Sequence, residues 1–438
     1  MQNPAMPRLT PQEFATALHQ GRGSACLHLR HAPSEELHDI ILDACLHDRA
    51  FDRQCEGPRS DWLYMLIAQD GRLCAAIIDA FEHPGDDQDC FQVANLVGLM
   101  ARNGNPRAAA ALRRSWAEND LAGEVAIFGL DGLPAALEVV RQLGHRLIAE
   151  PDDYVDSLDF LIGDEVLRDE VLSALRLRAP GDAGIAAYLS QHEQQAAREA
   201  QEQALTDEQR EQRRRAYVRD YMTEYPAARM IELARQPGKV ARGLFARFGR
   251  LAPDTECLAI LEALESAREP EMQRRLLDVF RPMGLHAWND TVWKLAHSQE
   301  PVVRLAAARA MASIEDGRIG SLARQRITDA DFSAERSEEL ELFTNNYLPG
   351  DELLIAAALE RIATDADGMH HLGMSALRVC QANRDVRLAV VAKFIYRTNP
   401  CTICRGDSVE WMKELGCLPD WIAAECRFDA SADIRALD

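Results

Sequence analysis

The chain has 438 residues, of which 47% are hydrophobic and 27% are charged. This composition is ordinary for a folded protein and excludes a wholly disordered chain. The formal net charge of −21 argues against a protein that coats nucleic acid over its whole surface. No apolar run is long enough to span a membrane, and the length predicts two or three domains or one long repeat array.

Eleven cysteines are present, and the first residues show no basic region followed by an apolar core. We therefore expect no signal peptide, a cytoplasmic location and cysteines that remain free thiols. The odd number excludes complete pairing within one chain.

Helix signals recur from the beginning of the chain. Thr10, Pro11 and Glu13 stand in the order of an N-cap, a first-turn proline and a capping-box glutamate. We find no strict alternation of apolar and polar residues, so the sequence predicts an all-α protein without a sheet. Short amphipathic helices are predicted at about 60–69, 71–82, 88–102, 105–118 and 131–147.

Residues 42–63 hold the densest group of reactive side chains. Cys45, His47 and Cys55 could bind zinc with a fourth ligand from elsewhere, or His47 could serve as the base for a nucleophilic Cys55. The interpretation that we favour is a structured loop whose acids cap helices and pair with arginines. The binding candidates of this loop are His47, Asp48, Asp52, Glu56, Arg59 and Trp62.

The polarity changes in the middle of the chain. Between residues 191 and 215, Leu205 is the only large apolar residue, which indicates an exposed helix or a mobile linker. A new helix should begin near Thr206 and should end or kink near Pro226. We predict an N-terminal helical domain at 1–190, a polar and basic helical linker at 191–252, and a C-terminal repeat domain at 253–438.

Positive charge is concentrated at residues 210–250, which contain eleven basic and four acidic residues. Tyr217, Tyr221 and Tyr225 share one helical face there. A basic and aromatic surface can bind phosphate; alternatively, the tyrosines face a core and the arginines pair with acids. We favour the second interpretation and do not expect a nucleic-acid partner. The candidate phosphate-binding residues are Arg213, Arg214 and Arg215.

A repeat of 31 residues occurs in the C-terminal half. Glu269-Pro270 and Glu300-Pro301 each open a block with the pattern helix, turn, helix. The segment Val303-Arg304-Leu305-Ala306 reappears at 386–389, after further predicted helices at 351–363 and 368–380 and a less regular stretch at 331–347. Helix pairs with a period near thirty predict a solenoid, because one pair alone cannot bury its apolar face.

The sequence EPVVRLAAARAMASI at 300–314 resembles the first helix of a HEAT-type repeat, and NRDVRLAVVAKFI at 383–395 is similar to a second. The resemblance is strongest at 269–328 and 384–416. It implies a curved array of helix pairs, that is, a HEAT-like α-solenoid with a less regular N-terminal helical region. Proteins of this kind are typically protein-binding scaffolds, although some are enzymes or bind DNA.

The C-terminal cysteines are candidate metal ligands. Two of them have the CxxC spacing of a zinc knuckle, whereas eight residues separate the other two, too many for a usual second knuckle. His370 and His371 could contribute if the last repeat folds back. Redox chemistry would require an adjacent strand–helix unit, which is not predicted. We expect no cofactor, with zinc as the alternative. The cysteines are Cys401, Cys404, Cys417 and Cys426.

The sequence lacks the phosphate-binding loop, the dinucleotide-binding glycine motif, the nucleophile elbow and the HExxH zinc motif. We therefore expect a non-catalytic scaffold or adaptor that binds another protein. The negative charge would steer a basic partner toward it. The alternatives are a nucleic-acid-binding protein that uses 210–250 and an enzyme or metal site at 42–63.

Overall fold

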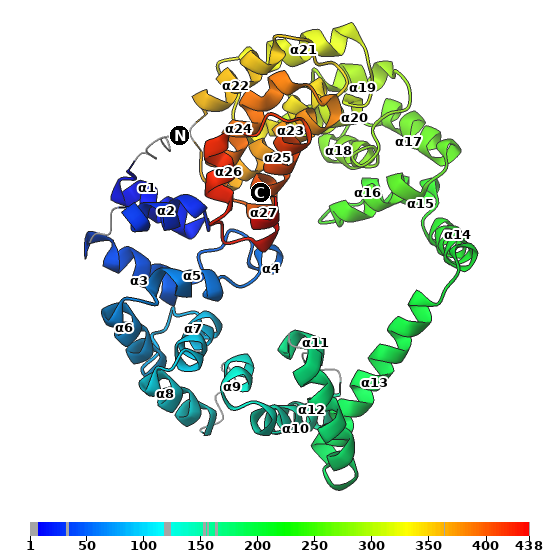
Figure 1. Ribbon diagram of the computed structural model, residues 1–438. Helices are drawn as coiled ribbons and strands as arrows, with labels where there is room; N and C mark the ends of the chain where they lie inside the picture. Colours follow the sequence, from blue (N-terminus) through cyan, green and yellow to red (C-terminus); the bar gives the residue numbers. More distant parts are fainter. Residues whose placement is uncertain are drawn as a thin grey trace. The chain divides into compact units, whose positions relative to one another are not determined.

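The computed structural model describes residues 8–31, 35–117, 124–151, 155, 157–162, 165–362 and 364–437. Helices, including the 3₁₀ helices, account for 75% of the described residues, against about 30–35% α-helix in average globular proteins, and the described residues contain no strand. The all-α prediction is therefore confirmed (Figure 1). Within this described part, no helix combines the length and apolarity needed to cross a bilayer. Residues 1–7, where we looked for a signal peptide, lie outside it.

The chain divides into two compact units. The first unit comprises residues 1–206 and 428–431, and the second comprises 207–427 and 432–438. The division after Thr206 falls inside the segment that the sequence assigns to a linker.

The first unit consists of helices that pack mainly against their neighbours in sequence, with α7 against α8 and α9, and α10 against α12 and α13 (Figure 1). Its elements are α1 (Pro11–His19), α2 (Gly23–His31), η1 (Glu35–Leu37), α3 (His38–Leu46), α4 (Arg53–Glu56), α5 (Ser60–Ile67), α6 (Gly71–Glu82), α7 (Cys90–Arg102), α8 (Pro106–Ala117), α9 (Glu124–Asp131), α10 (Leu133–Ala149), α11 (Leu158–Leu161), α12 (Glu165–Arg178), η3 (Ala179–Gly181) and α13 (Ala183–Gln203).

The predicted helix starts of the first unit are confirmed by their caps. The Thr10 hydroxyl accepts a hydrogen bond from the backbone N–H of Glu13 at 3.3 Å, and the Glu13 carboxylate accepts one from the backbone N–H of Thr10 at 2.8 Å. Asp70 and Asp89 cap α6 and α7 from one side only, because their side chains accept backbone N–H groups of the first turn. Each cap satisfies backbone donors that the first helical turn leaves without partners.

The second unit contains the sequence repeat. Its elements are α14 (Asp207–Glu224), α15 (Ala227–Arg235), α16 (Arg242–Leu251), α17 (Asp254–Ser266), α18 (Pro270–Asp278), α19 (Asp290–Leu295), α20 (Pro301–Met311), α21 (Gly317–Thr328), η4 (Ala334–Phe343), α22 (Asp351–Arg361), α23 (Ala366–Asn383), η5 (Val386–Leu388), α24 (Ala389–Thr398), α25 (Thr402–Glu414), α26 (Asp420–Cys426) and α27 (Ala432–Ala436).

One series of these elements forms a continuous row. In it, α16 packs on α18, α18 on α20, α20 on η4, η4 on α23 and α23 on α25. We call this series the helix row. The other helices of the pairs pack on its members: α19 on α20, α21 on η4, and α24 on both α23 and α25 (Figure 1). Side chains from α16 to α25, which are far apart in sequence, therefore lie next to one another along the helix row.

The repeat register holds only in part. Under the 31-residue shift, Leu277 and Ala308 are both buried, as are Phe280 and Met311. The third pair differs, because Met283 is 60% exposed while Ile314 is half-buried.

The repeated Val-Arg-Leu-Ala segment adopts two different conformations. Its first copy lies inside α20, with Val303 fully buried, whereas the second copy forms the 3₁₀ turn η5, with Val386 54% exposed. The reason is local: the Asp385 side chain accepts the backbone N–H of Arg387 and fixes a turn ahead of α24. The two copies are therefore not structurally equivalent.

The polar stretch at 191–215 is helical and exposed. Helix α13 continues to Gln203 with nearly every residue after Ser190 exposed, and α14 begins at Asp207. Helix α14 ends at Glu224, as the following Tyr225-Pro226 predicts, because the residue before a proline disfavours the helical region. The sequence left open whether this stretch is an exposed helix or a mobile linker. In the structure it is an exposed helix on both sides of a short break at 204–206.

Candidate functional site

A pocket of about 560 Å³ lies along the helix row of the second unit. Its lining comes from the start of α16, from α18 and the turn after it, and from α20, η4 and α23. The apolar part of the lining includes Val302, Leu305 and Met374. Two glutamates and five arginines also line the pocket; the arginines are Arg242, Arg274, Arg281, Arg309 and Arg378.

A buried carboxylate holds two of the arginines at one end of the pocket. Asp278, at the end of α18, is 1% exposed and accepts two hydrogen bonds of 3.1 Å from Nε of Arg242. Nη1 of Arg274 donates to the same carboxylate. Burial raises the pKa of Asp278, and the two arginines oppose this shift. Because an unpaired buried charge is costly, this carboxylate fixes both guanidinium groups in place.

Two glutamates of η4 hold the other arginines. Glu338 lies 3.0 Å from Nη1 of Arg309 and 3.7 Å from Nη2 of Arg281. Glu341 is buried and accepts hydrogen bonds from Nη1 of Arg378 and, at 3.2 Å, from the hydroxyl of Ser375. The arginines of α20 and α23 are thereby tied to the element that packs between these helices.

Arg281 lies close to two other arginines of the pocket. Burial lowers the pKa of Arg281, and the neighbouring Arg309 and Arg242 lower it further, against the opposing effect of Glu338. When the neighbours of a cation disfavour its charged form, an approaching anion stabilises that form. At this point of the pocket the repulsion between the three arginines is only partly offset by Glu338 and Asp278.

An unused donor lies in the same wall. Nε of Arg309 is buried and has no hydrogen-bond partner among the described residues; the Glu341 carboxylate lies 3.5 Å away, outside good geometry. A buried donor without an acceptor costs roughly 1–3 kcal/mol. An added carboxylate oxygen would relieve that cost.

Sequence reasoning missed this pocket. Its arginines are spread between positions 242 and 378, and no short motif connects them. The repeat predicts that the first helices of successive pairs lie side by side, so the arginines on those helices could have been collected as one group. The sequence did not show that 331–347 belongs to this series of helices, because the stretch forms the 3₁₀ helix η4 rather than an α-helix.

The candidates in the 42–63 loop each have a structural partner. The His47 ring lies 3.0 Å from the Asp43 carboxylate, and the Asp48 carboxylate accepts the backbone N–H of Ala50. Asp52 caps α4 by accepting the N–H groups of Gln54 and Cys55. These contacts match the favoured interpretation of a structured loop.

The end of the loop is buried. The Arg59 guanidinium contacts the Glu56 carboxylate and the carbonyl oxygen of His19. The indole N–H of Trp62 donates to the carbonyl oxygen of Phe428 at 2.8 Å, which fastens segment 428–431 to the first unit. Within the described residues, the loop forms no group of three potential metal ligands.

The two loop cysteines differ in environment. Burial raises the pKa of Cys45 to about 12, so this thiol is protonated at neutral pH, and Cys55 is exposed. The structure does not bring Cys45, His47 and Cys55 together as a metal-ligand group.

The basic segment 210–250 forms most of α14, all of α15 and most of α16. Tyr221 is buried and donates its hydroxyl to the carbonyl oxygen of Leu244 at 3.3 Å, while Tyr217 is 43% exposed. Nε of Arg214 and Nε of Arg215 each donate to Glu211 at 2.7 Å, and these bonds lower the pKa of Glu211 to about 2. All three arginines of the 213–215 group are exposed, so their ion pairs add little stability.

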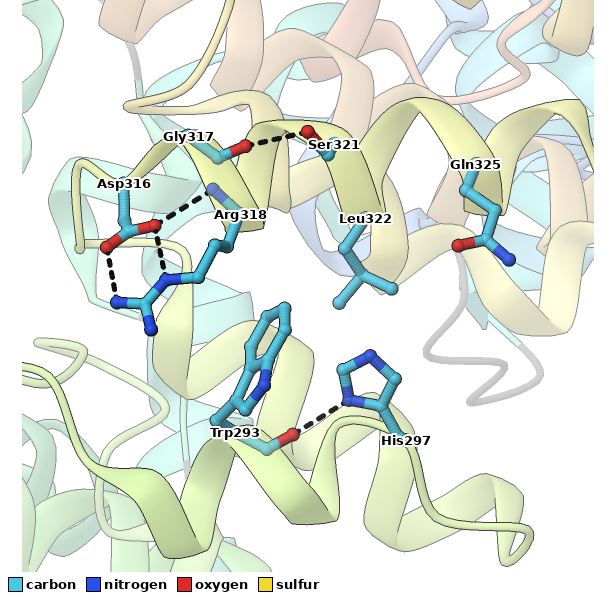
Figure 2. A pocket seen from close by; sticks show the side chains of 8 residues that line it. All are labelled: Trp293, His297, Asp316, Gly317, Arg318, Ser321, Leu322 and Gln325. Atoms are coloured by element: carbon cyan, nitrogen blue, oxygen red, sulfur yellow. Dashed lines mark hydrogen bonds and ion pairs between the residues drawn. The ribbon is translucent and has the colours of Figure 1, made fainter.

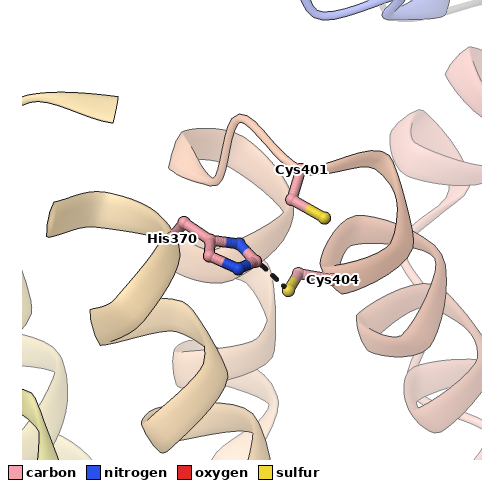
Figure 3. A group of neighbouring side chains, drawn as sticks. All are labelled: His370, Cys401 and Cys404. Carbon is pink, nitrogen blue, oxygen red and sulfur yellow. Dashed lines mark hydrogen bonds between the residues drawn. The ribbon is translucent and has the colours of Figure 1, made fainter. Parts of the chain in front are cut away.

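The CxxC segment meets a histidine from a distant helix. His370 on α23 lies with Cys401 and Cys404 so that one potential ligand atom of each falls within 4.8 Å of the others. Nδ1 of His370 is 3.7 Å from Sγ of Cys404 (Figure 3). The other two predicted ligands, Cys417 and Cys426, do not join this group. A hydrogen bond with Cys401, together with burial, raises the pKa of Cys404.

A further pocket of about 610 Å³ lies between α19 and α21. Asp316 and Arg318 pair with each other at its edge, at the start of α21, at 2.7 and 2.9 Å, and the Ser321 hydroxyl donates to the carbonyl oxygen of Gly317 (Figure 2). Because these charged groups neutralise one another, this pocket is less suited to a charged ligand than the arginine-lined pocket.

Comparison with protein-family models, with curated proteins and with solved structures finds no match for this chain.

Proposed function

We propose that the protein is a non-catalytic scaffold of the HEAT-like α-solenoid kind, and that its arginine-lined pocket binds an acidic segment of a partner protein. The observation that carries this proposal is the convergence of five arginines from α16, α18, the turn after α18, α20 and α23 around one pocket. Stacked helix pairs present long rows of side chains, which suits an extended partner.

The chemistry of the lining favours carboxylates combined with apolar side chains. Arginine forms charge-assisted hydrogen bonds with carboxylates, and Nε of Arg309 is an available buried donor. Val302, Leu305 and Met374 give the same pocket an apolar surface. A peptide in which glutamates alternate with leucines offers both kinds of group.

The acidic character of the whole chain does not oppose this proposal. At physiological ionic strength the Debye length is about 8 Å, so a ligand inside the pocket responds mainly to the side chains that line it. The net charge of −21 would still steer a basic partner to other surfaces. The acidic segment is proposed for this pocket alone.

Fluorescence polarisation with a labelled Glu/Leu peptide tests the proposal. We expect saturable binding that weakens as salt is added, and much weaker binding of a Gln/Leu peptide of the same length. The informative variant is Arg281→Gln, because its charge is already disfavoured by Arg309 and Arg242. The variant should keep or gain thermal stability and lose roughly tenfold in peptide affinity, as expected for the loss of one charge-assisted contact of about 1.4 kcal/mol.

The matched control is Arg318→Gln, which removes an exposed arginine from the other pocket of the same unit and should leave peptide affinity unchanged. Equal binding by the wild type and Arg281→Gln would contradict the proposal. Binding of a single-stranded oligonucleotide in preference to the Glu/Leu peptide would also contradict it. If reversal of Arg213, Arg214 and Arg215 abolished that binding, the nucleic-acid alternative would take its place.

A further inference from the structure

Two cysteines and a histidine form a compact, half-enclosed group at the end of the helix row. Cys401 and Cys404 are 3% and 6% exposed, and His370 is half-buried. Neither cysteine is part of a disulfide bond. Figure 3 shows the imidazole facing the sulfur of Cys404, with Cys401 beside them at the start of α25.

The separations suit a tetrahedral metal ion. With a zinc–sulfur distance of about 2.3 Å and a zinc–nitrogen distance of about 2.0–2.1 Å, a nitrogen and a sulfur on a tetrahedral ion are about 3.6 Å apart. The observed separation between Nδ1 of His370 and Sγ of Cys404 is 3.7 Å. The potential ligand atoms of all three residues lie within 4.8 Å of one another.

The start of α25 would help to hold two metal-bound thiolates, although burial and the Cys401 hydrogen bond keep the Cys404 thiol protonated when no metal is bound. Cys401 is the N-cap residue of α25, and Cys404 lies in the first turn of that helix. The exposed N–H groups and the dipole at a helix N-terminus stabilise a thiolate. Metal binding requires thiolates, because a protonated thiol is not a ligand.

A single asparagine fixes the two parts of the group relative to each other. The Asn399 side chain accepts the backbone N–H of Cys401 at 3.0 Å and donates to the carbonyl oxygen of Met369 at 3.2 Å. Asn399 is fully buried, and it fits because Gly373 has no side chain: a Cβ there would lie 1.9 Å from Nδ2 of Asn399. The residue next to His370 is thus held to the turn that carries Cys401.

We propose that His370, Cys401 and Cys404 bind a thiophilic divalent cation, Zn²⁺, with a water molecule as the fourth ligand. Two thiolates and an imidazole form a soft donor set that selects zinc over Mg²⁺ or Ca²⁺. On binding, each thiol releases its proton to the solvent, and the imidazole coordinates through a neutral ring nitrogen. The ion would link α23 to α25, which already pack together, and would stabilise the end of the second unit independently of peptide binding.

Cobalt spectroscopy on the full-length protein tests the site, because Co²⁺ replaces Zn²⁺ and its bonds to thiolates give an intense near-ultraviolet charge-transfer band. Under reducing conditions, we expect one equivalent of Co²⁺ to produce this band and the visible absorption of a tetrahedral site, and Zn²⁺ to bleach both. The double variant Cys401→Ser with Cys404→Ser should lose the charge-transfer band. The matched control Cys417→Ser removes a cysteine outside the group and should keep the spectrum.

A second measurement does not depend on the folding of any variant. Zn²⁺ should slow alkylation of Cys401 and Cys404 in the wild-type protein at least tenfold, as located by mass spectrometry, while alkylation of the exposed Cys55 and Cys90 stays unchanged. Absence of the charge-transfer band in the wild type would overturn the proposal. Protection of other cysteines, or an unchanged cobalt spectrum in the double variant, would overturn it equally.

Discussion

Gly144 on α10 and Gly184 on α13 lie so close that a Cβ atom added to Gly144 would stand 1.8 Å from the carbonyl oxygen of Gly184. The two helices share the most extensive packing in the first unit, and their backbones touch at this point. The contact anchors the buried beginning of α13, around Ile185 and Tyr188, from which the exposed remainder of the helix extends.

Gly144→Ala should therefore destabilise the first unit strongly. A Cβ atom cannot be accommodated unless α10 and α13 move apart, and overpacking of this kind costs about 1–3 kcal/mol or more. The measurement is thermal or denaturant unfolding. The control is Gly71→Ala in the same unit, where a Cβ meets nothing within 4 Å; it should change stability by less than about 1 kcal/mol. Equal effects of the two substitutions would contradict the close packing.

Adjacent valines in α20 should respond differently to the same substitution. Val303→Asp places a carboxylate at a fully buried position and should destabilise the protein by several kcal/mol. Val302→Asp, at a position that is 48% exposed, should change stability by about 0.5 kcal/mol or less. Leu305→Asp should be intermediate, because Leu305 is half-buried in the pocket wall. Wild-type stability of Val303→Asp would show that the register of α20 is wrong.

Limited trypsin digestion should cut first at Arg198, Arg210 or Arg213–Arg215. These residues are exposed on helices that bury little apolar surface, so local unfolding there costs little free energy. The cuts should fall near the division of the chain after Thr206, as mass spectrometry of the fragments can show. First cuts within 269–328 would contradict this expectation.

Asp316 should make stability depend on pH in the acid range. Hydrogen bonds from the Arg318 side chain and backbone lower the pKa of Asp316 from 3.8 to about 2. Because the folded-state pKa lies below the unfolded value, the carboxylate stabilises the folded protein above the unfolded pKa. That contribution is lost as pH falls through the folded pKa. Asp316→Asn keeps a capping residue but removes the charge. The difference in free energy of unfolding between wild type and this variant, measured by denaturant unfolding, should therefore shrink as the pH falls from about 4 to about 2.

The matched background for this experiment is Arg318→Gln, since Arg318 is the cause of the shift. In that background, the pH dependence contributed by Asp316 should become smaller, and the part that the backbone N–H of residue 318 causes should remain. A difference between wild type and Asp316→Asn that stays constant over the same pH range would show that the ion pair does not stabilise the folded state.

The sequence by itself predicted the helices and many of their ends. Thr10 with Glu13 and the Tyr225-Pro226 step act through backbone groups within a few residues of themselves, so their effects are independent of the rest of the fold. The polar character of α13 and α14 could be predicted in the same way. Amphipathic spacing showed which face of each helix is buried, because burial depends on the apolar stripe more than on the identity of the neighbour.

Only the tertiary structure decided which distant residues meet. The arginines between 242 and 378 gather because α18, α20, η4 and α23 stack in a row, and His370 joins the CxxC segment because Asn399 connects α23 to it. The segment Val-Arg-Leu-Ala became helix in one place and 3₁₀ turn in another because its flanking residues and packing differ. Contacts across many residues depend on how whole surfaces fit together, and short-range patterns in a sequence do not contain that information.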